Sequence, residues 1–201
     1  MNRAELKSQA RQQISGKIGI LFLISLIIAV ISGISAFVLA LVPFIGPLAN
    51  TLIVMPAFVL SITRVYLGIA SNAEPSAEDA FCGFDDFWSA FKVNFLVGLF
   101  TYLWSLLFVI PGIVKAFSYS MSMYILAENK GKAALDCINE SKAMTNGYKM
   151  DLFVLDLSFI GWALLGVLTF GIAFIWIIPY RNATYANAYL RLKSLKTGPE
   201  F

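Results

Sequence analysis

The feature of this chain that most limits its fold is a long stretch without charge. Residues Ile18 to Val42 form 25 consecutive positions with no Asp, Glu, Lys or Arg. About 20 apolar residues are enough for a helix to cross the hydrocarbon core of a bilayer. The stretch is also longer than the apolar core of a signal peptide, which has about 7–15 residues. We therefore predict a retained transmembrane helix rather than a cleaved leader.

The composition extends this prediction to the whole chain. Hydrophobic residues make up 59% of the 201 positions and charged residues only 13%, whereas soluble domains carry about 25% charged residues. Polar surface this scarce cannot cover a water-soluble particle, so lipid must cover much of it. We predict an all-α fold: a polytopic membrane helix bundle with about six transmembrane helices plus cytoplasmic interfacial helices. Residues 1–197 are expected to form one membrane-embedded domain, and residues 198–201 a flexible tail.

Turn signals separate the apolar segments from one another. Pro43 to Pro47 and Pro111-Gly112 are expected to be outer turns. Two alternatives remain for the last outer turn. One is the segment from Thr169 to Gly171, and the other is Pro179, which would continue a threefold repeat because Pro43, Pro111 and Pro179 lie 68 residues apart. After the first span, the predicted spans are 48–67, 93–110, 113–127, 152–168 and 172–190.

Three segments outside the spans have the pattern of helices lying at the membrane surface. Residues 2–17 place three apolar side chains on one side and three basic ones on another. Residues 68–92 carry an aromatic stripe with Asp85 and Asp86 expected to face water. Residues 128–149 carry a narrow, mildly apolar stripe and are expected to end as a helix at Asn146-Gly147. The stripes are Leu6, Ala10 and Ile14; Phe81, Phe84, Trp88 and Phe91; and Ala134, Cys137, Ile138, Ser141 and Met144.

The positions of the basic residues predict the orientation. The segments 1–17, 68–92, 128–149 and 191–201 hold 12 of the 15 Lys and Arg residues, and the proposed outer turns hold none. Loops rich in Lys and Arg stay in the cytoplasm. We therefore expect a multi-pass protein of the cytoplasmic membrane with both termini in the cytoplasm. Cys82 and Cys137 would then lie on the reducing side, so no disulfide is expected.

Four ionisable residues fall within or at the ends of the predicted spans, and each needs an explanation because charge is costly in hydrocarbon. Arg64 and Lys115 lie near span ends, from which long side chains can extend to the interface. Asp156 and Arg181 lie on neighbouring spans, and we predict that they pair inside the bundle with Asn182 or Tyr185 nearby. The pair is either a structural ion pair or part of a polar site. If it is buried, removing one partner should destabilise the protein more than removing both.

Further polar residues share a helix face with Lys115. Ser118, Tyr119 and Ser122 follow it at helical spacing. Together with Asn182 and Tyr185 they are candidates for the lining of a polar crevice between the fourth, fifth and sixth spans. The alternative is that these side chains simply form hydrogen bonds between helices, as is common in membrane bundles.

Several strings of residues in the second half of the chain carry a resemblance. The strings are Ile110 to Lys115, Tyr119 to Asn129, Ser141-Lys142 with Gly147, Leu157 to Trp162, and Pro179-Tyr180. Together they resemble the bacterial integral-membrane family known only as domain of unknown function 975, over residues 5–192. That family is distantly similar to the membrane domain of some glycerophosphodiester phosphodiesterases. The resemblance implies a six-helix protein of the cytoplasmic membrane without an established activity, since the phosphodiesterase chemistry belongs to a separate soluble domain.

The absence of certain residue types and motifs excludes several classes of function. The chain has no histidine, which excludes catalytic groups built on His, and it has no nucleotide-binding loop. We therefore expect no enzyme activity, no cofactor, no metal and no nucleic-acid partner. The first hypothesis is a non-enzymatic membrane protein that binds membrane lipids, a peptide or a protein partner, for example in envelope homeostasis or resistance to membrane-active compounds. The alternative is a transporter or channel for a small solute, with a homo-oligomer left open.

Overall fold

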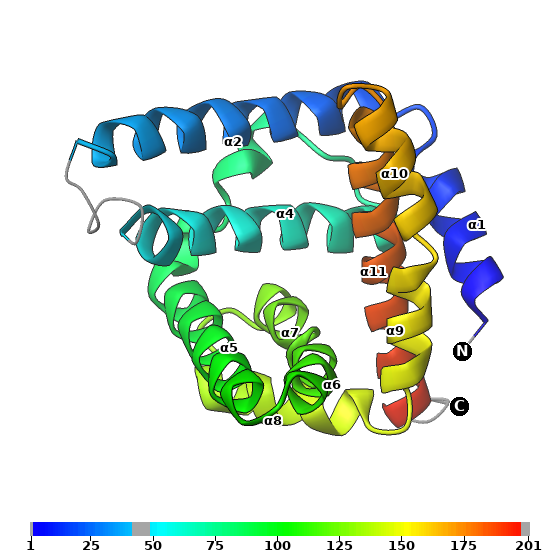
Figure 1. The fold of residues 1–201 in the computed structure, drawn as a ribbon. Coiled ribbons are helices and arrows are strands. Elements are labelled where there is room, and N and C mark those ends of the chain that lie inside the picture. Colours follow the sequence, from blue (N-terminus) through cyan, green and yellow to red (C-terminus); the bar gives the residue numbers. More distant parts are fainter. Residues whose placement is uncertain (1, 42–48, 198–201) are drawn as a thin grey trace.

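The computed structural model describes residues 2–41 and 49–197, and within these ranges it contains helices and no β-strand (Figure 1). The all-α fold predicted from the sequence is confirmed. The expected turn at 43–47 and the expected tail at 198–201 lie outside the described residues. In chain order the elements are α1 (Arg3–Ile14), α2 (Ile18–Leu39), the π-helical η1 (Asn50–Val54), α4 (Met55–Ala70), the 3-10 segments η2 (Ala77–Phe81) and η3 (Phe84–Asp86), α5 (Phe87–Leu107), α6 (Val109–Tyr119), α7 (Ser122–Glu128), α8 (Ala134–Thr145), α9 (Lys149–Leu157), α10 (Ile160–Leu168) and α11 (Phe174–Thr197).

Five helical stretches of the described chain are long and apolar enough to cross a membrane. They correspond to the first five predicted spans, so the polytopic membrane architecture is confirmed. The sixth expected span, α11, is not among them, because its 24 residues include four basic side chains and several Asn, Thr and Tyr residues. The five stretches are Ile18–Leu39, Asn50–Ala70, Ala77–Leu107, Val109–Glu128 and Lys149–Leu168.

The helices are arranged as hairpins whose axes cross. Figure 1 shows α2 and α4 running alongside one another, while α9, α10 and α11 run at a steep angle across one end of that pair. Helices α5 and α6 pack as a second hairpin, with α7 and α8 beside them. Helix α11 contacts α1, α2, α4, α8 and α10. The protein itself therefore covers much of α11, which explains why a helix with this many polar residues is tolerated.

Small side chains allow the neighbours of α11 to approach it closely. Ala183, Ala186 and Ala188 are almost fully buried, and Tyr189 and Leu192 continue the same buried surface toward the C-terminus. One cluster of buried apolar residues joins α11 to α1, α2 and α4, and a second joins it to α4, α5, α7, α8 and α9. Helix α11 thus links the two parts of the core.

The turn between the third and fourth predicted spans lies slightly earlier than expected. The helix breaks at Phe108, which has an extended backbone (φ −158°, ψ 143°). Pro111 instead occupies the first turn of α6, where the missing N–H of proline costs nothing. Gly112 faces α5 so closely that a Cβ there would lie 2.1 Å from Ser105 Oγ. The Pro-Gly dipeptide therefore starts the second helix and permits its close packing rather than forming the turn.

The turn between the last two predicted spans follows α10, as the first of the two alternatives predicted. Helix α10 ends at Leu168, and Phe170 and Gly171 adopt positive φ values of 50° and 92°. The Gly171 N–H donates to the carbonyl of Gly166 over 2.9 Å. Pro179 lies in the interior of α11. Because Pro111 and Pro179 occupy different positions in their helices, the threefold repeat is not supported.

Two predicted spans are interrupted. The fourth is divided into α6 and α7 at Ser120 and Met121, and the fifth into α9 and α10 at Ser158 and Phe159. The serine hydroxyls lie at the breaks and donate to carbonyls of the preceding turn, that of Ser120 to Phe117 over 2.8 Å. Neither break contains proline or glycine, so the sequence carried no strong signal for them.

The surface segments agree only in part with expectation. The helix α8 ends before Asn146-Gly147 as predicted, with a φ of 87° at Gly147, and its stripe is buried within the protein. Phe81, Phe84 and Trp88 are exposed at the surface of the protein, which leaves them available to the bilayer. The stripe on α1 was expected to face the membrane surface. It is instead buried against the protein, where α11 covers it.

Candidate functional site

The structure brings Asp156 and Arg181 together, as the sequence predicted. Asp156 lies next to the end of α9, and Arg181 lies in the first half of α11, which returns past α9 after the turn at Gly171. Arg181 Nη2 donates to Asp156 Oδ1 over 2.7 Å, and Arg181 Nε donates to the same oxygen over 3.2 Å. The prediction that the two charges pair is confirmed.

The location of the pair differs from the prediction. The side chains of Arg181 and Asp156 are 47% and 37% exposed, respectively. The pair was expected to be buried inside the bundle, but it lies in an open groove at the surface of the protein. Asp156 lies in a stretch long and apolar enough to cross a membrane, where an unpaired charge is costly, and pairing with Arg181 offsets that cost. Where water or a polar head group fills the groove, the pair itself contributes only about 0–1 kcal/mol to stability. Its two charges are accessible to a ligand.

A polar pocket lies on one side of the pair, with a volume of about 300 Å³. The guanidinium carbon of Arg181 lies 5.1 Å from the centre of the Tyr185 ring, close enough for a cation–π contact. Asn182 and Tyr185 are thus near the pair, as predicted. The polar pocket is lined by Ala116, Phe117, Ser120, Tyr124, Asp156, Arg181, Asn182 and Tyr185.

The same pair also lines an apolar groove. It has a volume of about 460 Å³ and lies between α10 and the first half of α11. The charged atoms of Asp156 and Arg181 therefore mark the border between a polar and an apolar space. The apolar groove is lined by Phe159, Ile160, Ala163, Phe174, Ile177 and Ile178, in addition to the pair.

Both helix breaks border this site. Ser120, at the break between α6 and α7, lines the polar pocket, and Phe159, at the break between α9 and α10, lines the apolar groove. In membrane proteins, interrupted helices are frequent at binding sites, because the break frees backbone groups and reshapes the local surface. The two helix breaks thus lie beside Asp156 and Arg181, the only charged residues of the described chain that line both the polar pocket and the apolar groove.

The other polar residues predicted on the fourth span point elsewhere. Ser118, Tyr119 and Ser122 are buried away from the polar pocket. Ser141 Oγ donates a hydrogen bond to the carbonyl of Ser118 over 2.8 Å and accepts one from the N–H of Met121 over 3.2 Å. These contacts fasten the break between α6 and α7 to α8. Of the residues predicted to line a crevice between the last three spans, only Asp156, Arg181, Asn182 and Tyr185 line the polar pocket, and Ala116, Phe117 and Ser120 take the place of the predicted face of the fourth span.

Lys115 lies apart from the pair. Its Nζ is 4.4 Å from the centre of the Trp104 ring on α5, so the ammonium makes a cation–π contact across the hairpin of α5 and α6. Lys115 was expected to extend to the interface as an isolated side chain. The Trp104 ring therefore supplies part of the stabilisation of the Lys115 ammonium that we had expected from water and lipid head groups.

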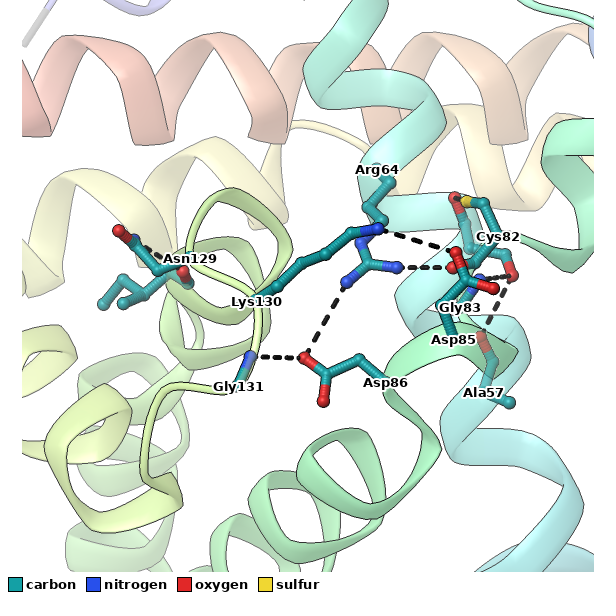
Figure 2. Close-up of polar contacts among 11 residues, drawn as sticks. Ala57, Arg64, Cys82, Gly83, Asp85, Asp86, Asn129, Lys130 and Gly131 are labelled. Atoms are coloured by element: carbon teal, nitrogen blue, oxygen red, sulfur yellow. Dashed lines mark hydrogen bonds and ion pairs between the residues drawn. The ribbon is translucent and has the colours of Figure 1, made fainter.

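Arg64 forms a second polar cluster, which the sequence did not predict (Figure 2). Its Nη1 donates to the carbonyl of Cys82, and its Nη2 lies 3.8 Å from Asp86 Oδ2. The same Asp86 oxygen accepts from the N–H of Gly131 over 2.7 Å. The side chains of Arg64 and Asp86 are only 11% and 13% exposed. The expectations that Arg64 extends to the interface and that Asp86 faces water were therefore wrong.

Close backbone packing supports the Arg64 cluster. The N–H of Gly83 donates to Ser61 Oγ over 2.8 Å, and a Cβ on Gly83 would lie 2.0 Å from the carbonyl oxygen of Ala57. At the rim, Lys130 forms an exposed ion pair with Asp85 at 3.5 Å (Figure 2). The cluster therefore fastens the loop between η2 and α5 to α4 and to the turn after α7. The sequence signal that could have predicted this cluster was an arginine in an apolar span followed by two adjacent aspartates.

Polar contacts also hold the C-terminal half of α11. Glu128, at the end of α7, accepts from Tyr189 Oη and from Lys193 Nζ, each over 2.7 Å.

Both cysteines are free thiols, and burial raises the pKa of the Cys137 thiol to about 11. Among residues 2–41 and 49–197, no three His, Cys, Asp or Glu side chains are grouped so that they could hold a metal ion. The pair of Asp156 and Arg181 thus remains the principal candidate.

The comparisons with known proteins agree with the resemblance seen in the sequence. Searches of the curated proteins and of the solved structures returned no significant match. A family model described as protein of unknown function (DUF975) matches residues 1–118 and 106–196, which together cover almost the whole chain. The chain therefore belongs to the DUF975 family of proteins of unknown function.

Proposed function

We propose that this protein is a non-enzymatic, multi-pass membrane protein that binds a membrane lipid at Asp156 and Arg181. One observation carries the proposal: the same two charged residues border a polar pocket and an apolar groove, and both spaces open to the surface. A molecule with a charged head and an apolar tail has the same division. Ligand sites are typically concave and mostly apolar, with a few polar groups that fix the orientation of the ligand.

The proposed location is the cytoplasmic membrane, with both termini in the cytoplasm. Support comes from the 12 of 15 basic residues in the segments 1–17, 68–92, 128–149 and 191–201. On this orientation the N-terminal end of α9 is cytoplasmic. Asp156 lies seven residues after Lys149, about 10 Å along the helix at 1.5 Å per residue. The charged pair would then be recessed below the cytoplasmic end of α9.

Photocrosslinking tests whether the apolar groove holds a lipid tail. The protein is reconstituted with phosphatidylethanolamine or phosphatidylglycerol that carries a diazirine on one acyl chain, and the labelled peptides are identified by mass spectrometry. We expect labelling of residues 159–178 by at least one of the two lipids. Ala163→Trp fills the groove and should lower this labelling about tenfold, which corresponds to one lost apolar contact of moderate size.

Leu164→Trp is the matched control, because Leu164 neighbours Ala163 on α10, is exposed and does not line the groove. It should leave the labelling unchanged. Equal labelling of the two variants, or labelling spread evenly over all exposed helices, would show that the lipid contacts are those of any membrane surface and would overturn the proposal.

A second candidate function is the transport of a small polar solute through the polar pocket. It is favoured by the two interrupted helices that border the site, a feature that transporters use at their binding sites. Proteoliposomes challenged with glycerol, urea or glycine can be followed by stopped-flow light scattering. A faster volume change than in protein-free vesicles, lost in Arg181→Gln but not in Arg191→Gln, would support transport. Equal rates in all vesicles would count against transport of these solutes.

A further inference from the structure

From the charges at this site we infer the chemical class of the lipid head group, an inference that rests on the proposed function. The geometry points to a zwitterionic head with a phosphate and a primary ammonium, as in phosphatidylethanolamine. Arg181 would bind the phosphate and Asp156 the ammonium.

The first argument is charge balance. Among the described residues, Arg181 is the only basic one that lines the polar pocket, and Asp156 is the only acidic one. The apolar groove adds no other charged residue. The residues that line the two spaces are therefore neutral overall, with opposite charges held next to one another. A lipid with net negative charge would meet the Asp156 carboxylate without compensation, whereas a zwitterion presents one opposite charge to each residue.

The second argument is that the Arg181 guanidinium has N–H donors that the ion pair with Asp156 does not use. Both hydrogen bonds from Arg181 end on Asp156 Oδ1. Within the described chain, Arg181 Nη1 has no hydrogen-bond acceptor among the protein atoms, and the guanidinium has five N–H donors in total. Guanidinium groups bind phosphate oxygens well because their donors form a planar fork. A phosphate can therefore bind without displacing Asp156.

The third argument concerns the surroundings of the ammonium. The polar pocket contains the rings of Phe117, Tyr124 and Tyr185. Aromatic rings attract cations through their negative faces. A primary ammonium also donates hydrogen bonds, which a carboxylate accepts. Aromatic rings attract both kinds of ammonium, so it is the Asp156 carboxylate that favours ethanolamine over choline, whose quaternary ammonium has no N–H to donate.

The apolar groove gives the head group a direction. It begins at the same two charged residues and continues between α10 and α11 past Ala163 and Ile178. A lipid whose head lies at the pair can therefore place the start of one acyl chain between these helices. Free phosphoethanolamine lacks this second contact, so the site fits a membrane lipid and not a free metabolite.

Competition between lipids of equal chain length tests the assignment. The full chain is purified in a mild detergent, freed of lipid and mixed with equimolar phosphatidylethanolamine and phosphatidylglycerol, and bound lipids are counted by native mass spectrometry. We expect an approximately tenfold preference for phosphatidylethanolamine, the size of one charge-assisted hydrogen bond. Phosphatidylcholine should bind with intermediate strength. Asp156→Asn should abolish the preference, and Arg181→Gln should weaken both lipids about tenfold.

Arg191→Gln is the control, since Arg191 is an exposed residue on the same helix and lines neither space. It should behave as the unaltered protein does. Equal binding of the two lipids to the unaltered protein, or preference for phosphatidylglycerol, would overturn the head-group assignment even if a variant failed to fold. In that case, labelling of residues 159–178 by the diazirine lipid would still support a lipid site. If neither lipid binds and no such labelling occurs, the proposed function falls as well.

Discussion

Two arginine–aspartate pairs in this protein use the same chemical groups in opposite settings. Arg64 and Asp86 are 11% and 13% exposed and are surrounded by backbone groups that add hydrogen bonds. Arg181 and Asp156 are 47% and 37% exposed and border two open spaces. The first pair fastens three segments of the chain to one another. The second leaves its charges accessible, which is the property that a binding site requires.

This difference predicts where a lost charge is most harmful. If one partner of a buried pair is removed, the other charge stays in a poorly solvated place, at a cost of about 3–5 kcal/mol. If one partner of an exposed pair is removed, water or a lipid head group can solvate the other, and the loss is about 0–1 kcal/mol. The two sites should therefore separate clearly in stability measurements and in lipid binding.

The largest effect is expected at Arg64. Arg64→Gln leaves Asp86 buried with only the N–H of Gly131 as a partner and removes the bond to the Cys82 carbonyl. The free energy of unfolding should fall by about 3–5 kcal/mol. Thermal unfolding in detergent measures the loss, with Arg191→Gln as the control. An unfolding temperature equal to that of the control would show that the buried pair does not hold the fold.

The next effect is expected at Gly83, beside the Arg64 cluster. In Gly83→Ala the new methyl group would lie 2.0 Å from the carbonyl oxygen of Ala57, so the backbone must move. Such overpacking costs about 1–3 kcal/mol. Gly98→Ala is the matched control, since a Cβ at Gly98 in α5 meets no atom within 4 Å. It should stabilise the helix by about 0.5–1 kcal/mol. Equal stability of the two variants would contradict the close approach.

A smaller effect on stability is expected at the open pair. Arg181→Gln and Asp156→Asn should each change the free energy of unfolding by less than about 1 kcal/mol, while Arg181→Gln lowers lipid binding. The sequence alone predicted a strong penalty for these single changes because it placed the pair inside the bundle. A loss of several kcal/mol in either variant, absent from the double variant, would restore that prediction and make the pair structural.

The smallest effect is expected at the rim of the Arg64 cluster. Lys130 and Asp85 form an ion pair whose side chains are both well exposed. Lys130→Met should therefore change the unfolding free energy by no more than about 0.5 kcal/mol. The result separates burial from charge as the source of stability in this cluster. A loss as large as that of Arg64→Gln would show that the number of charges, and not their burial, governs its strength.

The sequence predicted what depends on regular patterns along the chain. Apolar length located five spans, and the cost of isolated charge led to the pairing of Asp156 with Arg181. It did not predict the burial of Arg64, because Asp86 follows in short 3-10 segments that read as a surface stripe. The breaks at Ser120 and Ser158 were also missed, since they contain neither proline nor glycine. The apolar stripe of α1 could not reveal whether lipid or α11 covers it.

A structure determined with native lipids retained tests the central claim most directly. The claim is that the open pair, unlike the buried one, exists to bind a lipid. We predict density for a head group within hydrogen-bonding distance of Arg181 and Asp156, continuous with an acyl chain between α10 and α11. Lipid density elsewhere on the surface with an empty apolar groove would contradict the claim, as would a side chain of the protein itself filling the polar pocket.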